Sequence, residues 1–268
     1  MKTRVVLTGA AGKMGREAIR ALHATDDLTL VGAVVRGGGP TDAGELAGLG
    51  PIGVEVVPSD ARAVEDLLAR THPDVVLDFT GAEAATAYAR LAFDRGACFV
   101  TGATGFSPEQ LDTIKRGAES IGRGALVAPN FAIGALLMIQ FAKKAAEYFD
   151  HAEIIELHHN QKKDAPSGTA LKTAEALGEV HAQYGSTNVP ETEKRAGARG
   201  AETNGIRIHS VRLPGLLAHQ EVIFGGAGQA LTIRHDALSR ECYMPGVLLA
   251  VRKVLQLKGY VFGLEHLL

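Results

Sequence analysis

The sequence is short of cysteine, of charge imbalance and of long apolar runs, and each shortage excludes a class of protein. Two cysteines among 268 residues argue against a disulfide scaffold or a cysteine-built zinc site. Basic and acidic side chains number 28 and 30, so the chain lacks the basic excess typical of a nucleic-acid-binding protein. The longest nearly apolar stretch, residues 131–139, is far shorter than the roughly 20 residues of a membrane span.

What is present favours a cytoplasmic globular protein with no nucleic-acid, membrane or metal partner. The opening residues MKTRVVLTGAAGKMG contain no signal-peptide core or cleavage site. Apolar residues make up 46% of the chain and charged residues 22%, which is ordinary for a protein with a sizeable core. At about 150 residues per domain, the length predicts one large or two modest domains.

The first half alternates between short apolar runs and amphipathic segments. Strands are predicted at residues 4–8, 28–35, 75–79, 98–101 and 125–128, and helices at 13–24, 61–70, 82–95 and 108–117. The strands are almost continuously apolar, as expected when helices cover both faces of a parallel sheet. Residues 36–50 are rich in glycine. This half predicts an α/β, Rossmann-type, doubly wound parallel sheet.

The pattern changes near residue 130. We expect a helix over 131–149, a strand over 153–158, a helix from Thr169, and a polar, mobile or partner-facing loop over 185–205. Three strands are predicted at 206–213, 220–224 and 230–235, with turns at Pro214-Gly215 and Gly225-Gly226. A last helix, 245–258, resembles the first half. We therefore predict a dinucleotide-binding domain of residues 1–129 plus 240–268, and an inserted α+β substrate-binding and oligomerisation domain of residues 130–239.

A glycine pattern lies between the first strand and the first helix. Gly9, Gly12 and Gly15 fit G-x-x-G-x-x-G, a variant of the dinucleotide fingerprint. Such glycines allow a tight turn and let the backbone approach a pyrophosphate at the helix N-terminus. An ordinary strand-to-helix turn would show the same pattern, but its position favours nucleotide binding.

The end of the second strand bears on the choice of cofactor. An acidic residue there would bind the ribose 2′-hydroxyl of NAD, but the sequence has Val35-Arg36. Arginine suits a 2′-phosphate, and Lys13 offers a second cation. We expect NADPH to be accepted and leave NADH open. Arg36 could equally be a solvated loop cation.

Residues 153–171, EIIELHHNQKKDAPSGTAL, place two histidines, two lysines and a helix start together. Ser167 is a candidate N-cap, with the backbone N–H groups of Gly168 and Thr169 as anion donors. Cations beside a helix N-terminus suit a small carboxylate. Neighbouring strand residues face opposite sides, so His158 and His159 should differ in role. Structural histidines and surface lysines are the alternative.

This segment resembles the signature of the 4-hydroxy-tetrahydrodipicolinate reductase (dihydrodipicolinate reductase) family. Weaker matches follow the family's order: VLTGAAGKMG near the start, DFT at 78–80, TGATGF at 101–106, APNF at 128–131, then Ser239-Arg240 and Gly246. The resemblance implies NAD(P)H-dependent reduction of 4-hydroxy-tetrahydrodipicolinate to tetrahydrodipicolinate, with loss of water, in lysine and diaminopimelate biosynthesis. It also implies a homotetramer, and we expect the late strands to form a sheet that pairs between subunits.

The resemblance also implies residue roles. His158 matches the family's proton donor and acceptor, Lys162 its second proton donor, and His159, Gly168 and Thr169 its substrate-binding positions. The positions that match cofactor contacts are Gly9, Ala10, Ala11, Gly12, Lys13, Met14, Arg36, Gly102, Ala103, Thr104, Ala128, Pro129, Asn130 and Phe131. The chain departs from the family at Val35, where some members are acidic, and at Ala103, where the family often has threonine.

These residues suggest a mechanism in which the two domains close and bring Lys162 and His158 over the nicotinamide. Two other functions remain open. One is another Rossmann dehydrogenase, such as an aspartate or homoserine dehydrogenase, which has no reason to carry the His-His-x-x-Lys…Ser-Gly-Thr cluster. The other is a regulatory protein that binds NAD(P) without turnover, which would show no substrate-dependent oxidation of NADPH.

Overall fold

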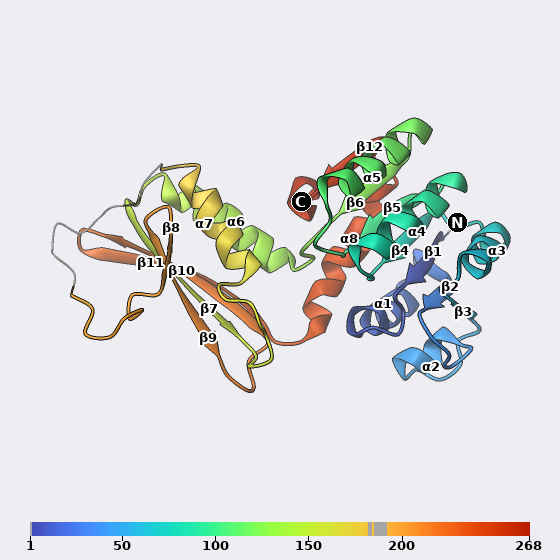
Figure 1. The fold of residues 1–268 in the computed structure, drawn as a ribbon, viewed down its shortest axis with the longest axis horizontal. Helices are drawn as coiled ribbons and strands as arrows, with labels where there is room; N and C mark the ends of the chain where they lie inside the picture. Colours follow the sequence, from blue (N-terminus) through green and yellow to red (C-terminus); the bar gives the residue numbers. More distant parts are fainter. Residues whose placement is uncertain (1, 182–183, 185–191) are drawn as a thin grey trace. The chain divides into compact units, whose positions relative to one another are not determined.

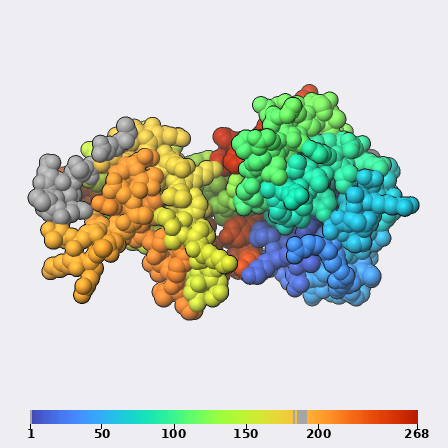
Figure 2. Space-filling view, viewed as in Figure 1, coloured from blue at the N-terminus to red at the C-terminus, as the bar shows by residue number. Residues whose placement is uncertain are grey.

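The chain folds into two compact units. The computed structural model describes residues 2–181, 184 and 192–268, which are coloured along the sequence in Figure 1 and Figure 2. Unit 1 comprises Met1–Ala132 and Tyr243–Leu268, and unit 2 comprises Ile133–Cys242. The chain therefore leaves unit 1 after residue 132 and returns at residue 243, against expected breaks after residues 129 and 239.

Unit 1 is built on a seven-stranded, wholly parallel sheet in the order β12-β6-β5-β4-β1-β2-β3. Its strands are β1 (Thr3–Thr8), β2 (Leu28–Val35), β3 (Val56–Pro58), β4 (Val75–Asp78), β5 (Cys98–Thr101), β6 (Gly124–Val127) and β12 (Gly259–Phe262). The central strands are buried along their length, for example VVLD of β4 and CFVT of β5. The predicted Rossmann-type sheet is confirmed.

Helices connect these strands and cover the sheet (Figure 1). They are α1 (Lys13–His23), α2 (Ala43–Ala47), α3 (Ala61–Thr71), α4 (Ala82–Asp94), α5 (Pro108–Ile121) and α8 (Met244–Val254), with a short 3₁₀ turn η2 (Leu264–Leu267). A second 3₁₀ turn, η1 (Arg240–Tyr243), spans the return from unit 2 to unit 1. The sequence prediction missed α2, β3 and β12, all five residues or shorter. In α2 the stabilising feature is the cap: Asp42 accepts from the Gly44 N–H at 2.8 Å.

Unit 2 is a mixed five-stranded sheet in the order β11-β10-β7-β9-β8. The elements are α6 (Ile133–Ala146), β7 (His151–His158), α7 (Gly168–Gly178), β8 (Ala201–Thr203), β9 (Ile206–Arg212), β10 (Ala218–Gly226) and β11 (Gln229–Ala237). Apolar residues of β7, β9 and β10 and of the two helices form one core, which includes Ile154, Ile208, Val222 and Leu177. The predicted second α+β domain is confirmed.

Across the described residues of both units, none of the helices combines the length and the apolar character that a membrane span requires.

Unit 2 differs from the sequence prediction in its details. Strands β9 and β10 follow each other in the chain but do not pair, because β7 lies between them, parallel to β9 and antiparallel to β10. The predicted turn at Gly225-Gly226 is wrong: both residues belong to β10, and the turn follows at 227–228, where Gly228 has a φ of 72°. Of the polar segment 185–205, residues 185–191 lie outside the described residues and Ala201–Thr203 forms β8.

A buried carboxylate ties three strands of unit 1 together at their carboxyl ends. Asp78 ends β4 and accepts hydrogen bonds from the hydroxyls of Thr8 at 2.5 Å, Thr80 at 2.6 Å and Thr101 at 2.7 Å. Burial raises the pKa of Asp78, and the three hydroxyls act against that rise. Thr101 also accepts from the Ala103 N–H at 2.9 Å. The loops after β1, β4 and β5 are thus fixed to one group.

Replacing Thr101 by valine should destabilise unit 1. The change removes the hydrogen bond to Oδ2 of Asp78, whose Oδ1 keeps Thr8 and Thr80, and leaves the Ala103 N–H without its buried acceptor, so we expect the free energy of unfolding to fall by about 2 to 4 kcal/mol. Urea denaturation followed by circular dichroism measures it. Thr3→Val, at the half-buried start of β1, is the control and should change stability little. Equal stability of the two variants would show that the Asp78 cluster does not hold the loops.

Candidate functional site

The glycine turn connects β1 to α1 at the carboxyl edge of the unit 1 sheet. Gly9 has a φ of 75°, a conformation that favours glycine, and a Cβ on it would lie 2.5 Å from the Phe79 carbonyl oxygen. A Cβ on Gly15 would collide with the carbonyl oxygen of Gly9. The helix begins at Lys13, after Gly12, which has no side chain to cap it. The first-turn N–H groups are therefore available to an anion.

The other cofactor candidates follow the carboxyl ends of neighbouring strands. Arg36 directly follows β2, residues 102–104 follow β5, and residues 128–131 follow β6. The strand order places these loops beside the glycine turn along one edge of the sheet, where ligands bind in open parallel sheets. The exposed candidates are Ala11, Gly12, Lys13, Arg36, Thr104 and Pro129.

Several of the residues predicted to contact the cofactor stabilise the loops through their own contacts, rather than offering free polar groups to a ligand. The N–H of Ala10 donates to the Val34 carbonyl at 3.1 Å, and that of Ala103 donates to Thr101. A Cβ on Gly102 would lie 2.8 Å from the Phe79 ring, which packs edge-on against Phe131 with ring centroids 5.8 Å apart. Asn130 accepts from the Ala132 N–H at 2.9 Å, and Met14 is half-buried. The edge is thus a preformed cradle of backbone, and it fits a dinucleotide.

In unit 2, the last residues of β7 and the start of α7 are both hydrogen-bonded to one acidic side chain. Glu156 is fully buried. Its Oε2 lies 2.5 Å from Nδ1 of His158, and its Oε1 accepts from the Ser167 N–H at 3.1 Å. Ser167 caps α7 as predicted, since its hydroxyl accepts from the Ala170 N–H at 3.2 Å. Gly168 and Thr169 are then the first two residues of the helix, where N–H groups lack partners within the helix.

The lysine side chain of the motif is held in the loop between β7 and α7. Nζ of Lys162 lies 2.8 Å from both carboxylate oxygens of Asp164, and its side chain is 21% exposed. The Lys162 ammonium, as the main cause, lowers the pKa of Asp164. The Lys162 N–H donates to the carbonyl of His159 at 3.1 Å. His159 lies just beyond β7, and Lys163 is exposed. Within unit 2, His158 and the start of α7 therefore meet on Glu156, and Lys162 lies in the loop between them, held by Asp164.

The sequence analysis missed two residues of this cluster, Glu156 and Arg212. The guanidinium of Arg212 forms a bidentate ion pair with the Glu156 carboxylate: Nη1 donates to Oε2 at 2.8 Å and Nη2 donates to Oε1 at 2.7 Å. Glu156 stands two positions before His158 in a strand, so alternation already placed the two on one face. Arg212 had no such signal, because its place opposite His158 depends on the pairing of β9 with β7.

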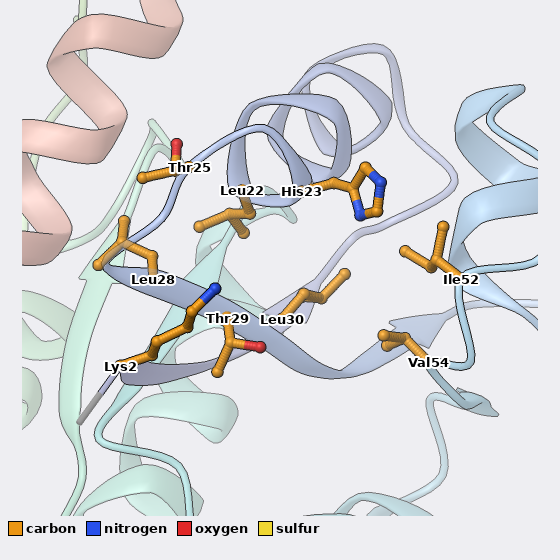
Figure 3. Close-up of a pocket in the computed structure, with 9 residues that line it drawn as sticks. All are labelled: Lys2, Leu22, His23, Thr25, Leu28, Thr29, Leu30, Ile52 and Val54. Atoms are coloured by element: carbon orange, nitrogen blue, oxygen red, sulfur yellow. The ribbon is translucent and has the colours of Figure 1, made fainter.

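A hollow of about 230 Å³ lies in unit 1 (Figure 3). Its lining residues are Lys2, Leu22, His23, Thr25, Leu28, Thr29, Leu30, Ile52 and Val54. They surround the amino-terminal part of β2 and the end of α1, whereas the cofactor candidates lie at the carboxyl ends of the strands. In the described part of the chain, no group of three or more His, Cys, Asp and Glu side chains could hold a metal ion.

Comparisons with known proteins match both halves of the chain. The dihydrodipicolinate reductase N-terminus model matches residues 3–131, and the C-terminus model matches residues 134–268. A 4-hydroxy-tetrahydrodipicolinate reductase of Moorella thermoacetica is 56% identical over 99% of this chain and 97% of that protein. One from Gloeobacter violaceus is 51% identical over the full length of both.

Solved structures agree with the sequence comparisons. A dipicolinate-bound dihydrodipicolinate reductase from Paenisporosarcina sp. TG-14 covers 100% of both chains with a TM-score of 0.88 and 42% identity. An amine dehydrogenase from Mycobacterium smegmatis, with a TM-score of 0.68 and 17% identity over 99% of this chain and 96% of its own, shares the fold alone. With both family models matched and relatives identical at half of their positions, this chain belongs to the dihydrodipicolinate reductase family.

Proposed function

We propose that the protein catalyses the NAD(P)H-dependent reduction of 4-hydroxy-tetrahydrodipicolinate to tetrahydrodipicolinate in lysine and diaminopimelate biosynthesis. One hydride and one proton are consumed, and one water and the oxidised cofactor are released. The main support is that a chain of this family carries a cationic group and a helix N-terminus beside a histidine, within one unit. A relative of the same fold binds dipicolinate, a planar dicarboxylate.

In this proposal, unit 2 binds the substrate and handles protons. The ammonium of Lys162 and the N–H groups of Gly168 and Thr169 bind substrate carboxylates, and His159 adds a further donor. An ion pair between exposed groups contributes about 0 to 1 kcal/mol, so a substrate carboxylate can replace Asp164 on Lys162 at little cost. His158, held through Nδ1, exchanges a proton through its other ring nitrogen. Lys162 is the second proton donor.

Unit 1 binds the cofactor, which supplies the hydride when bound. The first-turn N–H groups of α1 bind the pyrophosphate, and Lys13 and Arg36 bind a 2′-phosphate. No acidic residue stands at Val35 to select the free 2′-hydroxyl of NADH, so NADPH is accepted and NADH is not excluded. Residues 102–104 and 128–131 border the nicotinamide. Domain closure and a cytoplasmic location stay predictions.

Replacing Lys162 by alanine should abolish most turnover. We expect kcat to fall about 100- to 10,000-fold, because a proton donor and a carboxylate partner are both lost, while NADPH binding measured by fluorescence is unchanged. The assay generates the substrate from pyruvate and aspartate semialdehyde and follows NADPH absorbance. Lys163→Ala, next in the chain and exposed, is the matched control. Equal rates for the two variants would contradict the role of Lys162, and a wild-type protein without turnover would contradict the function.

Replacing Arg36 by alanine should discriminate between the two cofactors. A charged hydrogen bond contributes about 1.5 to 3 kcal/mol, so we expect the KM for NADPH to rise roughly 10- to 100-fold. The KM for NADH should stay within about twofold, because NADH has no 2′-phosphate. Arg62→Ala, in the first turn of α3, serves as control. Equal changes in the KM values for NADPH and NADH would instead show that Arg36 is a solvated loop cation.

We infer that the protein is a homotetramer assembled through the sheet of unit 2. Within the described residues, α6 and α7 pack against one face of that sheet, and the family resemblance supports pairing across the other. Light scattering coupled to gel filtration should therefore give four times the chain mass of 28.1 kDa. A monomeric mass at micromolar concentration would refute this assembly.

A further inference from the structure

The carboxylate of Glu156 is a buried anion whose partners lie on β7, on β9 and at the start of α7, with Ser210 of β9 among them. One oxygen meets His158 Nδ1 at 2.5 Å and Arg212 Nη1 at 2.8 Å. The other meets Arg212 Nη2 at 2.7 Å and the Ser167 N–H at 3.1 Å. The side chain has no exposed surface. A buried carboxylate with both oxygens engaged can neither rotate nor exchange partners freely.

The protonation of this carboxylate determines which nitrogen of His158 carries the proton. Burial raises the pKa of Glu156, but hydrogen bonds from His158 and Arg212 outweigh it and bring that pKa to about 2. An ionised carboxylate only accepts hydrogen bonds, so Nδ1 of His158 must carry a hydrogen. The neutral imidazole then has its free lone pair on Nε2, the atom left to exchange a proton with a ligand.

The same ion pair reaches the lysine of the motif through the backbone. Nη2 of Arg212 also donates to the carbonyl of Asp164 at 2.8 Å, and the carboxylate of Asp164 holds Nζ of Lys162. Ser167, held by Glu156, begins the helix whose first N–H groups are those of Gly168 and Thr169. His158, Lys162 and the start of α7 therefore each lie one or two links from the Glu156–Arg212 pair.

We propose that Glu156 and Arg212 are positioning residues: Glu156 fixes His158 in the Nδ1–H tautomer, and Arg212 fixes both Glu156 and the loop that carries Lys162. This inference rests on the proposed function for the role of His158, but its tautomer claim does not need a substrate. A serine protease shows the size of such an effect, since replacing its orienting aspartate by asparagine lowers kcat about 10,000-fold through the wrong histidine tautomer.

Glu156→Gln is the test, because it keeps the shape and removes the charge. A glutamine amide has one oxygen and one NH₂ group, whereas both oxygens of Glu156 accept hydrogen bonds. When the NH₂ group faces His158, Nδ1 must accept, and the ring takes the Nε2–H tautomer. We expect ¹⁵N spectra of histidine-labelled protein, assigned with His158→Gln, to show Nδ1–H for His158 in the wild type and a mixture in the variant.

Activity supplies the second measurement. We expect Glu156→Gln to lower kcat about 100- to 10,000-fold, with the KM for NADPH unchanged and a changed pH profile of kcat. Glu175→Gln is the control, because Glu175 lies exposed on α7, the helix that Ser167 caps. Its kcat should stay near that of the wild type.

The outcomes separate this inference from the proposed function. An Nε2–H tautomer in the wild type, or an unchanged tautomer and kcat in Glu156→Gln, would overturn the positioning role. A wild-type protein with the Nδ1–H tautomer but no reductase activity would refute the function alone. If Glu156→Gln fails to fold, the wild-type spectrum and Arg212→Lys still decide. Lysine lacks the two-pronged guanidinium but leaves Glu156 ionised, so His158 should keep the Nδ1–H tautomer while kcat falls at least tenfold because the Lys162 loop loses its anchor.

Discussion

The ion pair between the buried carboxylate of Glu156 and the partly buried Arg212 is the interaction on which the proposed substrate-binding cluster of unit 2 depends. The end of β7, the end of β9 and the start of α7 meet on the Glu156 carboxylate, and Arg212 also holds the loop after β7 by donating to the carbonyl of Asp164. A buried charge is expensive unless it is fully paired, so these segments have few alternative arrangements. That constraint fixes the positions of His158, Lys162 and the N-terminus of α7.

The proposed cofactor site of unit 1 is organised by the backbone instead. Gly9, Gly15 and Gly102 leave space where a side chain would collide with neighbouring backbone or an aromatic ring. The buried Asp78 then fixes the loops after β1 and β5 through threonine hydroxyls. A pyrophosphate needs close N–H groups more than side chains, whereas a small dicarboxylate and its proton need placed side chains. Unit 1 is therefore suited to recognition by backbone N–H groups, whereas unit 2 relies more on placed side chains.

This difference explains how much the sequence could predict. Apolar strands alternating with amphipathic helices predicted the parallel sheet, and the glycine turn follows from local geometry alone. The capping role of Ser167 could also be predicted from the sequence, because capping depends on residues close together in the chain. The short elements α2, β3 and β12 were missed because their stability comes from caps and neighbours. The position of β7 between β9 and β10, and with it the pairing of Arg212, depends on contacts distant in sequence.

A crystal structure of the protein with dipicolinate bound tests the central claim most directly, because it shows what the basic cluster of unit 2 recognises. The account predicts the Lys162 ammonium about 3 Å from one carboxylate of the ligand, having left Asp164, with the N–H groups of Gly168 and Thr169 on a carboxylate oxygen. Dipicolinate bound elsewhere, with Lys162 still on Asp164, would contradict it.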